Sequence, residues 1–173
     1  MKARLPGRSG DRGQALPEFA LLAPVLFLML FAVIQFGFTL GGYIGMSNAA
    51  RETARYAATV PTATSAQVLT ELTARQLPKA ILGFRPGNVV LGAGGSTIAY
   101  CGAANPNNNA GYPSYAIRVR VIAVYRHPLL IPLVGGIVDA LDGSTDNALT
   151  SRVVEEMRVE NPRLTSTGSL PSC

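Results

Sequence analysis

The sequence predicts an α+β protein with a long N-terminal helix, a second helix and a small antiparallel sheet. Three observations support this. An uncharged apolar run of about twenty residues extends from Phe19 to Phe38, which is the length of a membrane-spanning helix. Apolar residues recur at helical spacing between residues 66 and 82. Apolar and basic residues alternate from Tyr115 to Tyr125, as in a strand with one covered face.

The apolar run matches the thickness of a bilayer. At a rise of about 1.5 Å per residue, a helix over Phe19–Phe38 measures roughly 30 Å. The first charge after it is Arg51, so we expect the helix to leave the membrane around residues 41–43 and to continue outside. Pro24 and Gln35 are the irregularities inside the span, and Pro24 is expected to bend the helix.

A single carboxylate, Glu18, stands at the threshold of this run. An ionised side chain that enters hydrocarbon costs roughly 2.5–3.5 kcal/mol on insertion scales. Such a residue is out of place unless the protein needs it. Glu18 is therefore a functional candidate.

The charges predict the orientation in the membrane. Four basic residues and one acidic residue precede Glu18, and segments rich in Lys and Arg stay in the cytoplasm. Without residues 1–13, the fifteen basic and ten acidic side chains become eleven and nine, so the net charge falls from +5 to +2. The basic excess is therefore a topology signal, and it does not predict a nucleic-acid partner. The charged residues concerned are Lys2, Arg4, Arg8, Asp11 and Arg12.

A cleavable secretory signal is the alternative interpretation of a basic start followed by an apolar segment. The apolar part of such a signal is normally about 7–15 residues long, and this run is longer. The small residues that could mark a cleavage site, Ala49 and Ala50, lie too far downstream. The sequence favours a signal anchor.

The chain divides into five predicted regions. Residues 1–13 form a basic cytoplasmic leader and residues 14–42 a transmembrane helix. Residues 43–82 form an extracytoplasmic helical region, residues 83–162 an antiparallel sheet region, and residues 163–173 a flexible tail. The part beyond the span, about 130 residues, is enough for one modest globular domain.

Beyond the span, the first helix is expected to have one face in contact with water and one packing face. The packing face could belong to the core of the domain or contact other copies in a fibre; we expect a mixture of the two, with the core favoured from Tyr56 onward. Pro61 is expected to stop this helix. The polar arc comprises Asn48, Arg51, Glu52, Arg55 and Thr59, and the packing face comprises Tyr43, Met46, Ala50, Ala54 and Ala57.

A second helix is predicted over Ala66–Leu82, with an N-cap at Thr64-Ser65 and Gly83 after its end. Pro78 is expected to kink it or end it early. Its expected apolar face comprises Val68, Leu69, Leu72, Leu77 and Ile81.

The sheet region starts with two short candidate strands, Asn88–Leu91 and Thr97–Cys101, separated by a glycine-rich turn at residues 92–96. The polar residues 105–111 are predicted to form a surface loop.

The strongest strand, Tyr115–Tyr125, places Arg118, Arg120 and Arg126 on one face. A last strand, Leu149–Glu160, is predicted to present acidic residues that pair with Arg118 and Arg120 across the sheet. The charged residues expected on one face of that strand are Arg152, Glu156, Arg158 and Glu160.

Residues 128–141 are apolar but too short and too interrupted by Pro132, Gly135 and Gly136 to span a membrane. One interpretation is an amphipathic or buried helical segment that packs on the sheet. The other is a patch that faces a partner or rests on the membrane.

The residues expected to support catalysis or metal binding are few. His127 is the only histidine, and no acid or nucleophile is spaced to orient it. The glycines at residues 92, 94 and 95 lack the Lys-Ser/Thr of a phosphate loop. Asp139, Asp142 and Asp146 do not have the spacing of an EF-hand loop, and a solvated loop is the simpler interpretation. We therefore expect no enzyme, no cofactor and no metal site.

The two cysteines, Cys101 and Cys173, fit an oxidising compartment outside the membrane. A disulfide between them would close a loop of about seventy residues and stabilise the domain by roughly 4 kcal/mol in the chain-entropy model. Because Cys173 ends a polar tail, two unpaired thiols remain the alternative.

Gly13, followed by four residues and then by Glu18-Phe19 and the apolar helix, resembles the processing site of Flp-type prepilins. The wider stretch QALPEFALLAPVLFLMLFAVIQFG, together with NAARETARYAA, resembles the TadE-like family of pseudopilins of the Tad (tight adherence) pilus system. Later pieces, VIAVYRHPLLIP and SRVVEEMRVE, are also similar. The resemblance implies a pilin-like fold. It also implies that the protein lies in a bacterial cell membrane and can be incorporated in a pilus.

The resemblance also implies functions for four residues. A membrane prepilin peptidase would cut between Gly13 and Gln14, and Glu18, with Phe19 beside it, would serve assembly by meeting the new N-terminal amine of a neighbouring subunit. The expected partners are this peptidase, other pilins or pseudopilins, the inner-membrane platform of the pilus, and membrane lipid. The large outside domain implies a minor pseudopilin. The alternative is an uncleaved signal-anchor envelope protein whose outside domain binds a ligand or partner.

Overall fold

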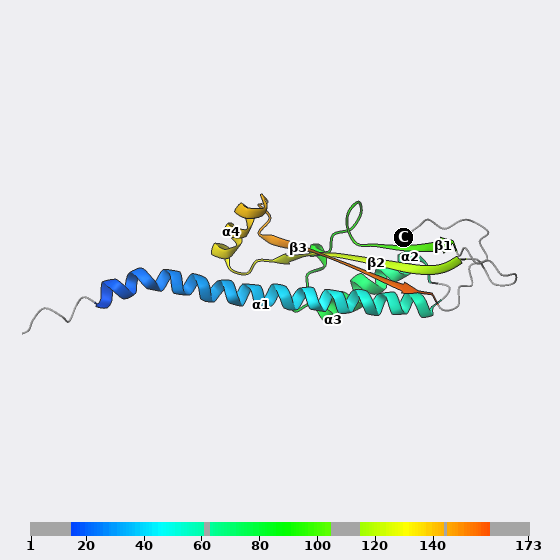
Figure 1. Ribbon diagram of the computed structural model, residues 1–173, viewed down its shortest axis with the longest axis horizontal. Helices are drawn as coiled ribbons and strands as arrows, with labels where there is room; N and C mark the ends of the chain where they lie inside the picture. The colour runs from blue at the N-terminus through cyan, green and yellow to red at the C-terminus, as the bar shows by residue number, and fades with distance from the viewer. Residues whose placement is uncertain (1–14, 61–62, 105–114, 144, 160–173) are drawn as a thin grey trace, which may run out of the picture.

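The computed structural model describes residues 15–60, 63–104, 115–143 and 145–159. One long helix runs along the molecule, and the other elements gather beside its C-terminal part as a head (Figure 1). The arrangement confirms the predicted α+β class. In chain order the elements are α1 (Ala15–Thr59), α2 (Ser65–Thr70), the π-helical turn η1 (Glu71–Gln76), α3 (Leu77–Ala80), the 3-10 turn η2 (Pro86–Asn88), β1 (Thr97–Ala104), β2 (Tyr115–Pro128), α4 (Pro132–Asp142) and β3 (Ala148–Arg158).

Helix α1 is unbroken over 45 residues, with Pro24 inside it. Its N-terminal part projects away from the head, and its C-terminal part lies along the sheet (Figure 1). The expected continuation of the apolar segment as a helix is therefore confirmed, and its location outside the membrane stays a prediction. The boundary expected near residues 42 and 43 falls inside this continuous helix, so the division into regions remains a prediction.

The C-terminal part of α1 buries a stripe of small residues. Ala50 and Ala54 are fully buried and Ala57 nearly so, while Arg51 and Arg55 are exposed. Alanines let the helix lie close to the sheet, as the predicted packing face requires. Tyr43 is not part of the core, because its side chain is 45% exposed. Contact of this side chain with another copy of the chain stays a prediction.

The second helix is confirmed at its start and corrected in its interior. Thr64 is the N-cap, and its hydroxyl accepts a hydrogen bond from the backbone N–H of Gln67 while the Gln67 side chain binds back, a capping box. The helix then widens into the π-helical turn η1 and ends at Ala80 instead of Leu82. Pro78 explains both changes, because it has no N–H and its ring conflicts with the carbonyl one turn earlier.

The sheet has the strand order β1-β2-β3, and both pairings are antiparallel. Strand β2 alternates as predicted, with one face packed on α1 and the other carrying Arg118, Arg120 and Arg126. It is longer than expected and reaches Pro128. The buried face of β2 comprises Ile117, Val119, Val121, Ala123, Tyr125 and His127.

The predicted short strand at residues 88–91 is corrected. Its first residue belongs to η2, and the rest forms only isolated bridges, Val89 with Tyr125 and Leu91 with Ser96. The glycine-rich turn after it is confirmed, because Gly92 and Gly94 have positive φ angles. The loop predicted at residues 105–111 lies outside the described residues.

The predicted pairing of charges across the sheet is present. Glu156 lies opposite Arg120 in the register, and its carboxylate is 2.6 Å from the guanidinium of Arg120 and 3.9 Å from that of Arg118. Strand β3 ends at Arg158, and Glu160 lies outside the described residues. Alternation in two strands was enough to bring these side chains together.

The apolar segment after β2 forms a helix, α4, as one interpretation expected, but this helix is not buried on the sheet. It lies beside α1 and contacts α1 and β3 (Figure 1). The inner face of the sheet is already covered by α1 and α2, so α4 packs elsewhere. Gly143, with a φ angle of 73°, ends it in the left-handed conformation typical of a helix C-terminus.

Candidate functional site

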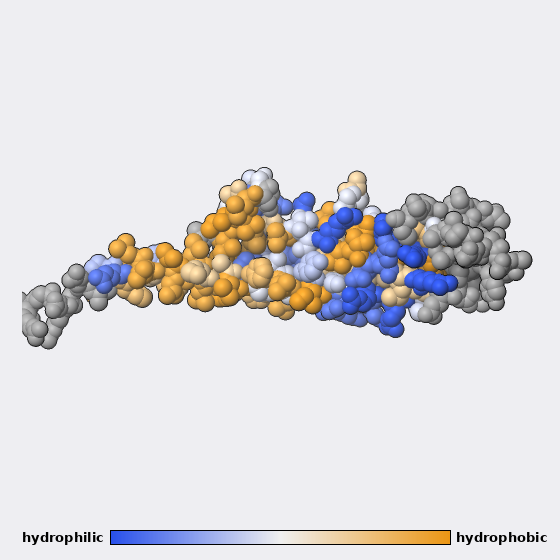
Figure 2. All heavy atoms as spheres, viewed as in Figure 1, coloured by the Kyte–Doolittle hydropathy of each residue, from blue (hydrophilic) through white to orange (hydrophobic). Residues whose placement is uncertain are grey.

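The N-terminal part of α1 carries an exposed apolar surface. Leu21 is 78% exposed and Val33 71%, and the large apolar side chains around them are exposed in the same way. Figure 2 shows this part of the helix as a nearly continuous hydrophobic surface. Among the described residues, α1 is the one helix whose length and composition allow it to cross a membrane. The chain thus has the long apolar helix that its sequence predicted, with the length and composition of a membrane anchor.

Glu18 lies in the first turn of α1. A carboxylate there is favoured by the partial positive charge at a helix N-terminus, by about 0.3–1 kcal/mol. The side chain of Glu18 is exposed, and Phe19 beside it is 66% exposed, so both are available to another molecule. Gly13 and Gln14, the predicted processing site, lie outside the described residues.

A polar contact joins the apolar part of α1 to the head. Gln35 is 4% exposed, and its side-chain carbonyl accepts a hydrogen bond of 2.8 Å from the backbone N–H of Leu130. Its side-chain amide N–H donates to the Thr39 hydroxyl at 3.5 Å, and this hydroxyl donates to the backbone carbonyl of Gln35 at 3.0 Å. The Gln35 side chain is therefore satisfied on both sides. The sequence singled out Gln35 only as an irregularity and gave no signal for its partner, which lies 95 positions away.

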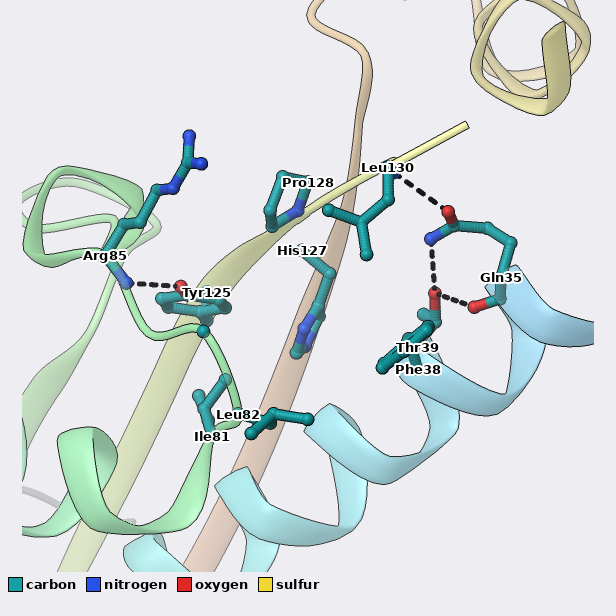
Figure 3. A pocket seen from close by; sticks show the side chains of 11 residues that line it. Gln35, Phe38, Thr39, Ile81, Leu82, Arg85, Tyr125, His127, Pro128 and Leu130 are labelled. Carbon is teal, nitrogen blue, oxygen red and sulfur yellow. Dashed lines mark hydrogen bonds between the residues drawn. The ribbon is translucent and has the colours of Figure 1, made fainter. Parts of the chain in front are cut away.

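A pocket of about 180 Å³ lies next to this contact. Its wall combines α1, the segment after α3, and the end of β2, as Figure 3 shows. The Tyr125 hydroxyl accepts a hydrogen bond of 2.9 Å from the backbone N–H of Arg85, which fixes the tyrosine in the wall. The pocket is thus part of the junction between the anchor and the head.

His127 contributes an imidazole ring to this wall. It is 5% exposed and packs edge-on against Tyr125, with the ring centres 5.0 Å apart. Gly42 of α1 lets the imidazole come close, since a Cβ there would lie 2.5 Å from His127 Cε1. Burial lowers the pKa of His127, and within the described residues its Nε2 atom has no hydrogen-bond partner. These observations describe a neutral ring used for packing.

None of the described residues that line the pocket has a carboxylate or a thiol, and the pocket has no hydroxyl paired with a base. Within the described part of the chain, His, Cys, Asp and Glu form no cluster able to hold a metal ion. The arrangement offers no nucleophile and base in contact. Its chemistry is that of packing and of one shared polar contact.

Two of the aspartates considered as metal ligands, Asp139 and Asp146, form contacts within the chain. Asp139 accepts a hydrogen bond from the backbone N–H of Asn147, and Asp146 accepts one from Ala148 and lies 3.9 Å from the guanidinium of Arg126. Cys101 is buried in β1. Cys173 lies outside the described residues, so the disulfide remains a prediction.

Comparison with protein families gives one match. Residues 13–55 match the family model described as TadE-like protein. The matched segment begins at the glycine of the predicted processing site and covers Glu18, the whole apolar run and the start of the buried alanine stripe. No curated protein and no solved structure matches the chain. The resemblance to the TadE-like family is thus confirmed over residues 13–55. The rest of the head lies outside this match and is known from the structure alone.

Proposed function

We propose that this protein is a single-pass minor pseudopilin of a Tad-type pilus, a type IV pilus, and that it acts in pilus assembly, adhesion or secretion. The observation that carries the proposal is the family match at residues 13–55, which joins the glycine-to-glutamate motif to a helix able to cross a membrane. In this proposal residues 14–42 lie in the bacterial cell membrane. The basic leader is cytoplasmic and the head extracytoplasmic.

The first step is removal of the leader. A prepilin peptidase cuts after Gly13 and leaves Gln14 as the new N-terminus. Glycine suits the position before the cut because it presents backbone without a side chain to a narrow active site. The structure describes the chain from Ala15 onward, and this part of the proposed mature chain is helical.

The second step uses Glu18 as a contact between subunits. Its carboxylate sits at the edge of the apolar surface and is exposed. The amine released at Gln14 of a neighbouring copy or pilin supplies the opposite charge. In a low dielectric, a pair of opposite charges offsets part of the burial cost that one charge alone does not. Other pilins, the inner-membrane platform and membrane lipid are the partners in this proposal.

The head supports a minor role within the fibre. A major Flp pilin is little more than the helix, whereas here a three-stranded sheet and several helices cover the C-terminal part of α1. Such a subunit fits the priming, tip or anchoring positions of a fibre better than its repeating body.

The cleavage step is tested by intact-mass measurement of the full chain expressed with the prepilin peptidase. We expect the mature chain to begin at Gln14, and we expect Gly13→Ala or omission of the peptidase to leave residues 1–13 attached. Gly10→Ala is the matched control, and it should be cleaved normally. A leader that stays attached in the unaltered chain would favour the uncleaved signal anchor instead.

The assembly step is tested by Glu18→Gln. This change should leave cleavage largely intact and reduce incorporation into pili, because the neutral side-chain amide of glutamine cannot form the ion pair. The control is Glu52→Gln, which removes a carboxylate of the same helix that pairs with Arg55 on the surface of the head. Normal pilus assembly by Glu18→Gln would remove the proposed role of Glu18.

A further inference from the structure

An apolar patch on the head lies beside the membrane anchor. The α4 patch comprises Leu130, which is 59% exposed, Ile137, which is 45% exposed, and Leu141, which is 83% exposed. In Figure 2 the hydrophobic surface of α1 continues onto α4, whereas the face of the head shown farther along α1 mixes hydrophilic and hydrophobic residues. The patch is therefore an extension of the anchor surface.

The contact between Gln35 and Leu130 sets the depth of this patch. Gln35 lies seventeen positions after Glu18 (35 minus 18), which is about 25 Å along the helix at about 1.5 Å per residue. A hydrocarbon core of about 30 Å that starts near Glu18 therefore still includes Gln35. Because Leu130 is hydrogen-bonded to Gln35, the beginning of the α4 segment is held at the level of the outer leaflet.

Several polar groups beside the α4 patch form hydrogen bonds within the chain, which lowers the cost of removing this segment from water. The backbone N–H of Leu129 donates to the carbonyl of Asn147 at 2.9 Å, and the Asn147 side chain donates to the carbonyl of Leu129 at 3.2 Å. The Asp139 carboxylate accepts a hydrogen bond from the Asn147 backbone. The polar groups of this hairpin thus bind one another, while Leu130, Ile137 and Leu141 remain exposed.

We propose that the α4 patch inserts into the outer leaflet of the bilayer that α1 crosses. The inference rests on the proposed membrane anchorage of α1. Lipid is the occupant because the patch continues the surface of the span at the depth of the span, where the surrounding solvent is acyl chain. The head then has two membrane contacts, α1 and α4, which hold it at a fixed tilt close to the membrane. Insertion of the α4 patch is favourable because burial of apolar surface in lipid drives binding at the membrane interface.

The absence of tryptophan from the sequence allows a direct test. The Leu141→Trp variant of the full chain carries a single indole at a position that is 83% exposed, so the substitution should not disturb the fold. The variant is reconstituted in phosphatidylcholine vesicles with and without phosphatidylcholine brominated on its acyl chains, which quenches indole emission on contact. Two comparison variants are Phe36→Trp in the span, 68% exposed, and Leu91→Trp on the head, 59% exposed.

We expect brominated lipid to quench Leu141→Trp as strongly as Phe36→Trp, with a blue-shifted emission, and to leave Leu91→Trp unchanged. If Phe36→Trp is quenched and Leu141→Trp behaves like Leu91→Trp, the α4 proposal is overturned and the anchor stands. A blue-shifted but unquenched Leu141→Trp would mean that protein, such as a neighbouring pilin, covers the patch, which also overturns it. Absence of quenching in Phe36→Trp and Leu141→Trp alike would overturn the anchorage and the α4 proposal together.

Discussion

The two parts of α1 belong to one helix and present opposite surfaces. Between residues 16 and 44 the large apolar side chains are exposed, with Leu21 at 78%. From Met46 onward the covered positions are mostly alanines, and Ala50 and Ala54 are fully buried. Large side chains create area for contact with lipid, whereas small ones let a sheet approach closely. The chemistry of the environment, and not helix propensity, therefore distinguishes the two parts.

The largest expected effect separates the core of the head from the anchor. Leu72 is fully buried under α1 and the sheet, so Leu72→Ala should lower the free energy of unfolding of the head by about 2–5 kcal/mol. Leu21→Ala removes the same atoms from an exposed position and should change it by less than about 0.5 kcal/mol. Urea unfolding in detergent, followed by tyrosine fluorescence, measures both. Equal losses would contradict the division of α1 into two environments.

A second comparison uses two glycines one helical turn apart. A Cβ at Gly45 would lie 2.1 Å from the backbone carbonyl oxygen of Ala80, so Gly45→Ala should destabilise the head by about 1–3 kcal/mol. Gly41 has open space at this position, and Gly41→Ala should be neutral or stabilise the helix by up to about 1 kcal/mol. The same unfolding assay should give effects of opposite direction. A harmless Gly45→Ala would mean that α3 does not lie against α1 as closely as described.

A third prediction concerns His127 at the border between the two parts. Burial lowers its pKa in the folded state, so the unfolded chain takes up a proton first as the pH falls through about 6.5. The contribution of the neutral His127 ring to the free energy of unfolding should therefore be complete above that pH and should decrease below it. His127→Gln does not titrate and should show a weaker decrease over the same window, by an amount smaller than the packing losses above. Identical pH profiles would exclude a buried, neutral ring.

The smallest expected effect is on the outer face of the sheet. Arg120 and Glu156 are partly exposed, so Arg120→Glu should lower the free energy of unfolding by about 0.2–1 kcal/mol. The double change Arg120→Glu with Glu156→Arg restores opposite charges and should recover part of this loss. High salt should reduce the difference between the single and double variants. A single variant as stable as the unaltered chain would show that the pair does not contribute to stability.

The features predicted from sequence are those that depend on neighbours along the chain. The apolar run predicted α1, Thr64-Ser65 predicted a helix start, and the alternation in β2 predicted its two faces and the pairing with Glu156. The end of the second helix was missed because a π-helical turn absorbs Pro78, a local adjustment that periodicity does not reveal. The exposure of Tyr43 was not predicted because it depends on where the head begins.

The sequence by itself determined the anchor, the glutamate at its edge and the alternation of the sheet, because these follow from composition and from the two periods of helix and strand. The tertiary structure alone decided that α4 lies beside α1, that Leu130 binds Gln35 and that His127 packs on Gly42. Each of these contacts joins residues more than eighty positions apart, and each depends on the full path of the chain around the sheet. Local sequence patterns carry no information about such contacts, because only the path of the chain in the folded topology brings these residues together.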